Sequence, residues 1–188
     1  MRSLLKSKKG LSTVVTTLII LVVSVLLATV VTFYAINVTT TRVEEESIKL
    51  YKLHTWHNGT NFAETAFLLI NTGGRDLVID KVTVRGQECA WNTVWYNKTQ
   101  DTINIDLPYL TPNADSTLPA SVTIGTATYN LTQGTAEGDL ILRSGDSMIV
   151  YIANPDHISV NDIGVTVGIM VFTANAQYYK ESNVQASS

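Results

Sequence analysis

The chain has 188 residues, which is enough for one small domain and an appended segment but too short for two large domains. Hydrophobic residues make up 45% of it and charged residues only 15%, with a formal net charge of −3. The basic residues Arg2, Lys6, Lys8 and Lys9 precede every acidic residue, so the remainder is acidic and no basic patch predicts a nucleic-acid partner. The single cysteine, Cys89, excludes an intrachain disulfide framework and a Cys-x-x-Cys-His haem site; we expect it to be buried.

A long apolar segment follows the basic N-terminal residues directly. Residues 11–36 carry no charged side chain, and as a helix of about 39 Å they can cross a hydrocarbon core of about 30 Å. The segment is longer than the apolar part of a secretory signal, and no small-x-small cleavage site follows it. Basic residues before it and Glu44–Glu46 after it predict that the N-terminus lies inside and the rest outside.

Small and hydroxyl side chains recur along this segment at spacings of three, four or seven residues. On a helix these spacings fall near one stripe. Small residues let helix backbones approach closely, and hydroxyls can bond the carbonyl four residues back. Helix packing through the stripe is one interpretation; the other is that such residues are common in every membrane helix. The stripe consists of Thr13, Thr17, Ser24, Ala28, Thr32 and Ala35.

After residue 46 the pattern changes to short β-branched stretches with a period of two, separated by Asn, Gly, Asp and Pro. Many short strands of this kind predict a sandwich or a barrel. Pro108, Pro112 and Pro119 lie close together, which predicts a long surface loop. The expected strands are 48–56, 65–70, 77–84, 89–96, 102–107, 121–124, 126–131, 140–143, 147–153, 164–173 and 177–184.

The junction between the basic leader and the apolar segment resembles a class III signal peptide of type IV pilins and archaellins. Lys8-Lys9-Gly10 stands directly before Leu11-Ser12-Thr13. The resemblance implies that a membrane peptidase cuts between Gly10 and Leu11, so that the whole helix survives in the mature chain. Bacterial pilins usually carry Glu at the fifth mature position, which is Val15 here, so the resemblance is to archaeal pilins.

Two stretches of the head extend the resemblance. Residues 68–84, with the turn Asn71-Thr72-Gly73, look like the first hairpin of archaeal pilin heads, and residues 164–180 look like their closing strands. Residues 89–140 are unmatched. The implied fold is α+β, with a leader at 1–10, an apolar helix at 11–47 and an immunoglobulin-like antiparallel β-sandwich head at 48–188.

The function implied by the resemblance is that of a pilin, the structural subunit of an extracellular filament used for surface attachment. The implied partners are identical subunits, the class III signal peptidase, an assembly platform protein with its ATPase, and the membrane before assembly. An archaellin is an alternative, although archaellin helices usually begin with a Gly-rich stretch that 11–17 does not resemble. A membrane-anchored surface binding protein that never polymerises is the other alternative.

No residue pattern indicates catalysis or a cofactor. His54 and His57 are three residues apart on an expected strand, which places them on opposite faces and argues against a shared metal. The turn at 144–147 lacks the Gly-x-Ser-x-Gly context of a nucleophile elbow. Four Asn-x-Thr sequons predict N-glycans, with sugars expected on the outer surface at Asn58, Asn97 and Asn130 and little or none at Asn37, near the end of the helix.

Overall fold

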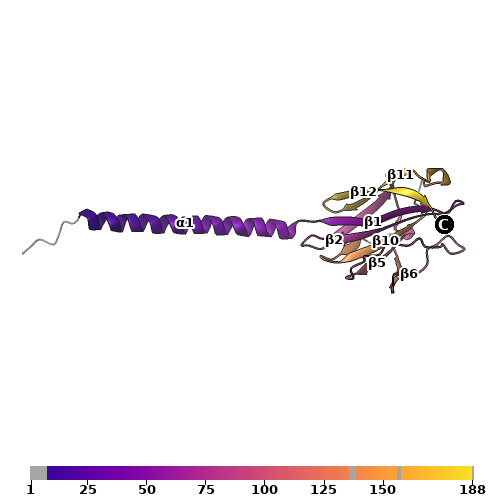
Figure 1. The fold of residues 1–188 in the computed structure, drawn as a ribbon, viewed down its shortest axis with the longest axis horizontal. Helices are drawn as coiled ribbons and strands as arrows, with labels where there is room; N and C mark the ends of the chain where they lie inside the picture. The colour runs from indigo at the N-terminus through magenta and orange to yellow at the C-terminus, as the bar shows by residue number, and fades with distance from the viewer. Residues whose placement is uncertain (1–7, 136–138, 156–157, 188) are drawn as a thin grey trace, which may run out of the picture. The chain divides into compact units, whose positions relative to one another are not determined.

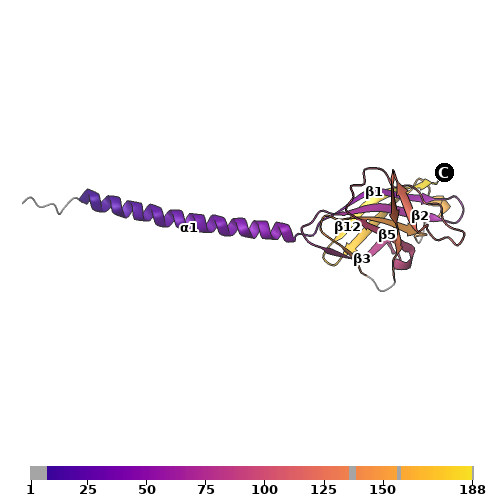
Figure 2. The same ribbon diagram turned by 90° about the horizontal axis from the view of Figure 1, so that it is seen from below.

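The computed structural model describes the backbone of residues 8–135, 139–155 and 158–187, and the side chains of these residues except 8–11 and 42–44. The chain divides into two compact units, Met1–Val43 and Glu44–Ser188. The two units are a helix and a β-rich head, drawn from two sides in Figures 1 and 2. An apolar helix followed by a largely antiparallel sheet is the coarse α+β layout that the sequence predicts.

The helix unit contains one element, α1, Lys8–Glu44, with 37 residues. It is rich in Val, Ile and Thr, which are modest helix formers in water. In an apolar environment the helix satisfies every backbone group within its own segment, so the sequence favours it there. The helix begins before the expected leader boundary, so the peptide bond between Gly10 and Leu11 lies inside its first turns.

The head contains strands and two single-turn 3-10 helices. The strands are β1 Ile48–His57, β2 Ala63–Asn71, β3 Leu77–Val84, β4 Gln87–Glu88, β5 Val94–Thr99, β6 Ser121–Ile124, β7 Ala127–Asn130, β8 Thr132–Gln133, β9 Leu140–Leu142, β10 Ser147–Ala153, β11 Thr166–Thr173 and β12 Gln177–Ala186, and the 3-10 helices are η1 Trp91–Thr93 and η2 Val160–Asp162.

One curled sheet joins all of these strands except the hairpin β6–β7. Its order is β4-β3-β11-β12-β1-β2-β10-β5-β8, and β9 also pairs with β3. Neighbouring strands are antiparallel apart from β1 and β12, which run parallel with Thr55 opposite Val184 and His57 opposite Ala186. The first and last strands of the head therefore lie side by side, and they connect the two halves of the sheet.

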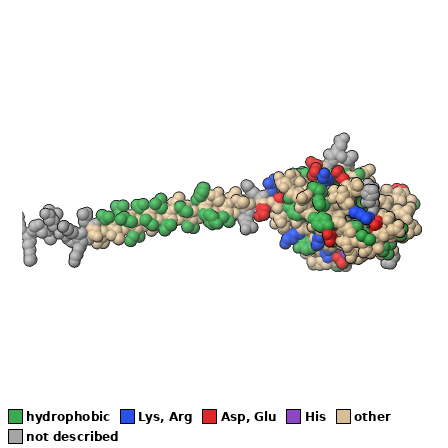
Figure 3. Space-filling model, turned by 90° about the horizontal axis from the view of Figure 1, so that it is seen from above, with side chains coloured by type: hydrophobic (Ala, Val, Ile, Leu, Met, Phe, Trp, Pro, Cys, Tyr) green, Lys and Arg blue, Asp and Glu red, His purple; other side chains and the backbone are tan. Residues whose placement is uncertain are grey.

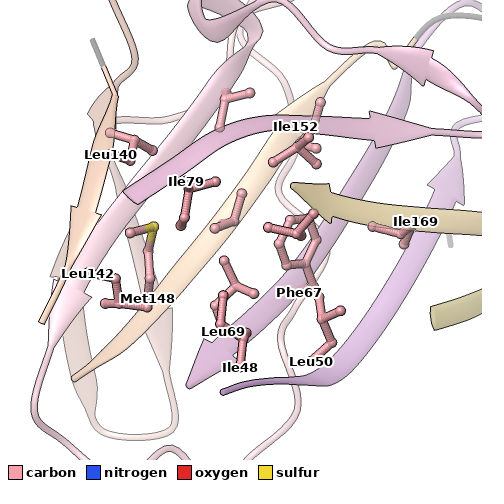
Figure 4. Packing of buried hydrophobic residues seen from close by; sticks show 14 of the residues in the cluster. Ile48, Leu50, Phe67, Leu69, Ile79, Leu140, Leu142, Met148, Ile152 and Ile169 are labelled. Atoms are coloured by element: carbon pink, nitrogen blue, oxygen red, sulfur yellow. The ribbon is translucent and has the colours of Figure 1, made fainter. Parts of the chain in front are cut away.

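A hydrophobic core fills the inside of the curl. It takes side chains from β1, β2 and β10 on one side and from β3, β9 and β11 on the other. Figure 4 shows Phe67, Leu69, Ile79 and Met148 directed into this space. Strand β11 alternates between buried and half-buried residues, as a strand with one covered face should. Cys89 is buried in the same core, as its type predicts.

A second core covers the opposite face of β1, β2 and β10. Leu68, Ile149 and Tyr151 of the sheet are fully buried here. They lie beneath residues 100–120, called the strap below, and beneath the β6–β7 hairpin, which contribute further apolar side chains to the cluster. Strands β2 and β10 are thus covered on both faces, which explains why both are buried over nearly their whole length.

Two of the expected strands are wrong. Residues 102–107 form no strand but belong to the strap, where Ile103 and Leu107 are buried against the second core. Residues 89–96 are interrupted by η1, and β5 begins only at Val94. In both stretches an irregular segment buries apolar side chains against a sheet. Over so few residues the spacing of these side chains cannot be distinguished from the period of two of a strand.

The turn after β2 is packed against the segment that enters β1. The backbone amides of Thr72 and Gly73 both donate to the Ser47 carbonyl, at 2.9 and 3.1 Å. A Cβ on Gly73 would lie 2.6 Å from the Glu45 carbonyl oxygen and 2.8 Å from the Ser47 nitrogen. The glycine of the Asn-Thr-Gly turn is therefore required by close backbone approach.

Candidate assembly helix and surface sites

The helix carries an apolar surface on every side. Residues Ser12–Thr41 form a stretch of 30 residues, long and apolar enough to cross a membrane, and an 18-residue window within it has a mean hydropathy of 2.9. Its large side chains are exposed, including Leu21 at 63% and Phe33 at 69%. Figure 3 shows hydrophobic side chains along most of the visible face of the helix, with other side chains and backbone between them. A surface of this size requires a covering, by lipid or by protein, because exposing it to water is unfavourable.

The hydroxyl side chains of the helix are turned back onto its own backbone. Thr17 Oγ1 donates to the Val14 carbonyl at 2.9 Å, and Ser24 Oγ donates to the Ile20 carbonyl at 2.7 Å. Thr32 Oγ1 makes the same bond to the carbonyl four residues before it, at 2.7 Å, and so do Thr16, Thr29, Thr40 and Thr41. These polar groups are satisfied within the helix, so they can enter an apolar environment at little cost.

The six small or hydroxyl residues of the stripe share one face of α1. At about 100° per residue they fall within an arc of about 100°. Val14, Leu21 and Val31 fall in the same arc, so larger side chains interrupt the stripe at its beginning and at about one third and two thirds of the apolar stretch. The stripe comprises Thr13, Thr17, Ser24, Ala28, Thr32 and Ala35.

Two sequon asparagines of the head, Asn58 and Asn130, donate no hydrogen bond from the amide nitrogen to any described residue. Asn58 is half-buried, and its Oδ1 accepts three backbone hydrogen bonds, of 2.9 to 3.0 Å, from Thr60, Asn61 and Phe62. This arrangement holds the side chain still while leaving Nδ2 unused. Asn130 is exposed at the end of β7. Both asparagines belong to turns or strand ends of the head, where a transferase can reach them.

The other two sequons differ. Asn97 lies in β5, half-buried, and its Nδ2 donates to the backbone carbonyl of Asn130 at 2.6 Å. Asn37 is exposed on α1, in the last third of the helix. The structure thus brings Asn97 and Asn130 together, 33 residues apart in sequence, and leaves the other two separate.

The histidines of β1 are held in separate surroundings. The His54 ring stacks on Trp56 with a centroid distance of 5.0 Å, and its Nε2 lies 3.4 Å from Asp106 Oδ1. His57 is buried, and its Nδ1 accepts a hydrogen bond from the Gly59 amide at 3.0 Å. Within residues 8–135, 139–155 and 158–187 no three His, Cys, Asp or Glu side chains are close enough to hold a metal ion.

Glu64 of β2 carries a buried carboxyl group that the sequence analysis does not predict. It has 0% exposure, and its Oε1 accepts a hydrogen bond from the Leu110 amide of the strap at 3.1 Å. Burial raises the pKa of Glu64 to about 8, against a smaller lowering by that hydrogen bond. Burial likewise raises the pKa of Tyr151, and the nearby Glu64 adds to the shift. One feature of the sequence could have indicated the burial of Glu64. It directly precedes residues 65–70, a run without charged residues that predicts a strand covered on both faces.

Comparisons with known proteins leave the family open. No protein-family model and no curated protein sequence matches the chain. Among solved structures, a copper-bound PCuAC domain from PmoF2 is similar over 76% of this chain and 99% of its own, with 13% identity and a TM-score of 0.34. A family 123 glycoside hydrolase from Clostridium perfringens is similar over 77% of this chain and 28% of its own, with 9% identity and a TM-score of 0.29. These scores carry no argument about fold or activity.

Proposed function

We propose that this protein is the subunit of an extracellular filament of the archaeal type IV pilus kind, polymerising through its N-terminal helix for surface attachment. The observation that carries the proposal is the exposed, uncharged stretch Ser12–Thr41 on α1, joined to a head that has its own cores. The helix would first hold the subunit in the membrane. It would then pack with the helices of identical subunits in the filament.

The length of the apolar stretch favours polymerisation over simple anchoring. Its 30 residues span about 45 Å, which exceeds a hydrocarbon core of about 30 Å by several helical turns. A single anchor of this length must tilt strongly or thicken the bilayer. A bundle of identical helices covers the full length without either adjustment, and the stripe supplies positions where backbones can approach.

The proposal includes the finer features of such subunits. The head would be an immunoglobulin-like sandwich, for which the core enclosed between the two halves of the curled sheet is the support. Glycans on the head would face outward. The membrane peptidase, the platform protein and its ATPase would be the partners in processing and assembly.

Two matched substitutions test polymerisation against simple anchoring. Ala28→Leu fills the stripe but keeps the helix apolar, whereas Thr29→Leu makes a similar change at the neighbouring position outside the arc. We expect Ala28→Leu to reach the membrane normally and to form few or no filaments by electron microscopy. Thr29→Leu should form filaments. The unmodified chain, expressed with its peptidase and assembly proteins, is the reference. If it stays in the membrane and forms no filaments, the result favours an anchored binding protein instead.

A further inference from the structure

The strap covers the second core without a backbone ladder. Between residues 102 and 112, no backbone–backbone hydrogen bond is formed with any described residue. Three apolar side chains of the strap itself, Ile103, Leu107 and Leu110, are buried. The strap is therefore attached to the sheet by apolar contacts and by whatever side chains reach its peptide groups.

Three side chains from three neighbouring strands make those attachments. Lys52 Nζ of β1 donates to the Asn104 carbonyl at 2.7 Å, and Tyr151 Oη of β10 donates to the Pro108 carbonyl at 3.0 Å. Between these strands, Glu64 Oε1 of β2 accepts from the Leu110 amide at 3.1 Å. Lys52 has a φ of 51° at the irregularity in β1, an unusual conformation for a residue with a side chain.

The central attachment is incompletely satisfied. Glu64 Oε2 is buried and has no hydrogen-bond partner among the residues that the structure describes. Two tyrosines interact electrostatically with Glu64, Tyr109 of the strap and Tyr151 of β10; burial raises the pKa of each hydroxyl, and a charge on Glu64 adds to the shift. On β1, Trp56 is the residue opposite, and His57 uses its ring for the Gly59 amide.

The remaining charged groups nearby are engaged elsewhere. Lys52 and His54 of β1 both approach Asp106 of the strap, at 3.9 and 3.4 Å. No Lys, Arg or His among the described residues forms an ion pair with Glu64. A negative charge on its carboxyl group would thus be buried with a single amide donor to stabilise it.

We propose that Glu64 is a proton-operated latch, which holds the strap closed on the sheet while its carboxyl group is neutral and releases the strap when the proton is lost. The charged group requires water at Oε2, and the strap is the part of its surroundings that can move to admit it. Strand β2 cannot move in this way, because it is paired along its length with β1 and β10. The inference concerns the head alone and does not depend on filament assembly.

Burial raises the pKa of Glu64 from 4.5 to about 8, and an open strap exposes the carboxyl group to water, so strap opening should become more favourable as pH rises between these two values. Hydrogen exchange on the full chain in detergent tests it, at about pH 4 and about pH 8.5, just outside the two ends of that range. The matched variant is Glu64→Gln, which keeps the acceptor oxygen and cannot ionise. Comparing the two proteins at the same pH cancels the intrinsic pH dependence of exchange.

We expect the Leu110 amide, which donates to Glu64 Oε1, to exchange equally in the two proteins at the lower pH and at least about tenfold faster in the unmodified protein at the higher pH. Amides of β10 should remain protected throughout. A second variant, Tyr151→Phe, removes the Pro108 attachment but no titrating carboxyl; its strap should exchange faster at both pH values and keep the pH dependence.

Equal strap exchange in the unmodified protein and Glu64→Gln at the higher pH would overturn the latch. So would loss of protection in β2 and β10 together with the strap, because that is unfolding of the head rather than release of one segment. If Glu64→Gln does not fold, the unmodified protein decides alone. A Leu110 amide that loses protection as pH rises from about 4.5 to about 8, while β10 stays protected, supports the proposal, and a Leu110 amide equally protected at both pH values contradicts it.

Discussion

The amide nitrogen of Asn97 donates a hydrogen bond to the backbone carbonyl of Asn130, at 2.6 Å. Both residues are sequon asparagines, and Nδ2 is the atom to which an N-glycan is attached. Asn97 uses this atom to hold β5 to the end of β7. Asn130 contributes only its carbonyl to the contact, and its side chain is exposed. A folded head thus offers Asn130 for modification and withholds Asn97.

We therefore expect Asn130 and Asn58 to carry sugar in assembled protein, with less at Asn97 and little or none at Asn37. Thr132→Ala, which destroys the Asn130 sequon, should remove one glycan mass. Thr99→Ala, which destroys the Asn97 sequon, should leave the mass nearly unchanged apart from the substitution. Glycopeptide mass spectrometry reads all four sites. Sugar at Asn37 alone would mean that the boundary between core and surface is misplaced.

A second prediction concerns the leader. Cleavage between Gly10 and Leu11 should give filaments whose subunits lack the first ten residues, measured by intact mass. Gly10→Val should block cleavage and leave the precursor in the membrane, since the peptidase is expected to require the small residue. Ser7→Ala, elsewhere in the leader, serves as the control and should be processed. Met1 retained in assembled filaments of the unmodified chain would contradict the assignment.

A charge in the stripe should abolish assembly. Ala28→Arg places an unpaired cation at the middle of the apolar stretch, where it costs about 2.5–3.5 kcal/mol even in a bilayer. In a bundle of helices without water, every subunit would add the free-energy cost of one such unpaired charge. Ala28→Ser is the control, because its hydroxyl can bond a carbonyl one turn back, as the other hydroxyls of α1 do. Normal filaments from Ala28→Arg, seen by electron microscopy, would exclude a helix core.

Asn71 at the end of β2 should contribute more to head stability than any polar residue beside it. Its side chain is 1% exposed and makes three hydrogen bonds, to the Arg75 carbonyl, the Leu142 carbonyl and the Gly73 amide. Asn71→Ala removes all three bonds, although the Gly73 amide keeps the Ser47 carbonyl as an acceptor, and should lower the free energy of unfolding by about 3 kcal/mol. Thr72→Ala, at an exposed position, should change it by less than about 1 kcal/mol. Urea unfolding followed by tryptophan fluorescence measures both.

Head stability should fall as pH rises between about 4.5 and about 8. In this range folded Glu64 keeps a proton that the unfolded chain has released, because its pKa is raised from 4.5 to about 8. The unfolded state therefore binds fewer protons, and the free energy of unfolding decreases by up to about 1.4 kcal/mol per pH unit. Below that range both states are protonated and the contribution is constant. Glu64→Gln should flatten the profile; an unchanged slope would assign it to other groups.

Much of the head could be predicted where burial on one face imposes a period of two. Strands β3, β10 and β11 lie at or within two residues of the expected ranges. The apolar helix was equally visible, because a stretch of 30 residues without charge has few other interpretations. In each case the pattern is local, and the local pattern agrees with the fold.

What could not be predicted depends on contacts between distant residues. The parallel pairing of Thr55 with Val184 follows from the curl of the whole sheet, and nothing in either strand encodes it. The sequence of the strap resembles that of a strand because Ile103 and Leu107 are buried in the second core. The spacing of apolar residues in the sequence does not indicate that this second core exists. Glu64 was missed for the same reason. A carboxyl group beside an apolar run ordinarily predicts an exposed strand end, and only the strap makes this one interior.

The parallel seam between β1 and β12 gives the head a mechanical character. The first strand of the head begins at Ile48, and the last strand ends at Ala186. Pulling these two ends apart along the strands strains the whole seam in shear, so its contacts must break together and not one after another. Side chains of β12 reinforce it: Lys180 Nζ and Ser182 Oγ donate to the Leu50 and Leu53 carbonyls at 2.8 and 3.3 Å. A head closed in this way should resist extension applied between the start of its first strand and the end of its last.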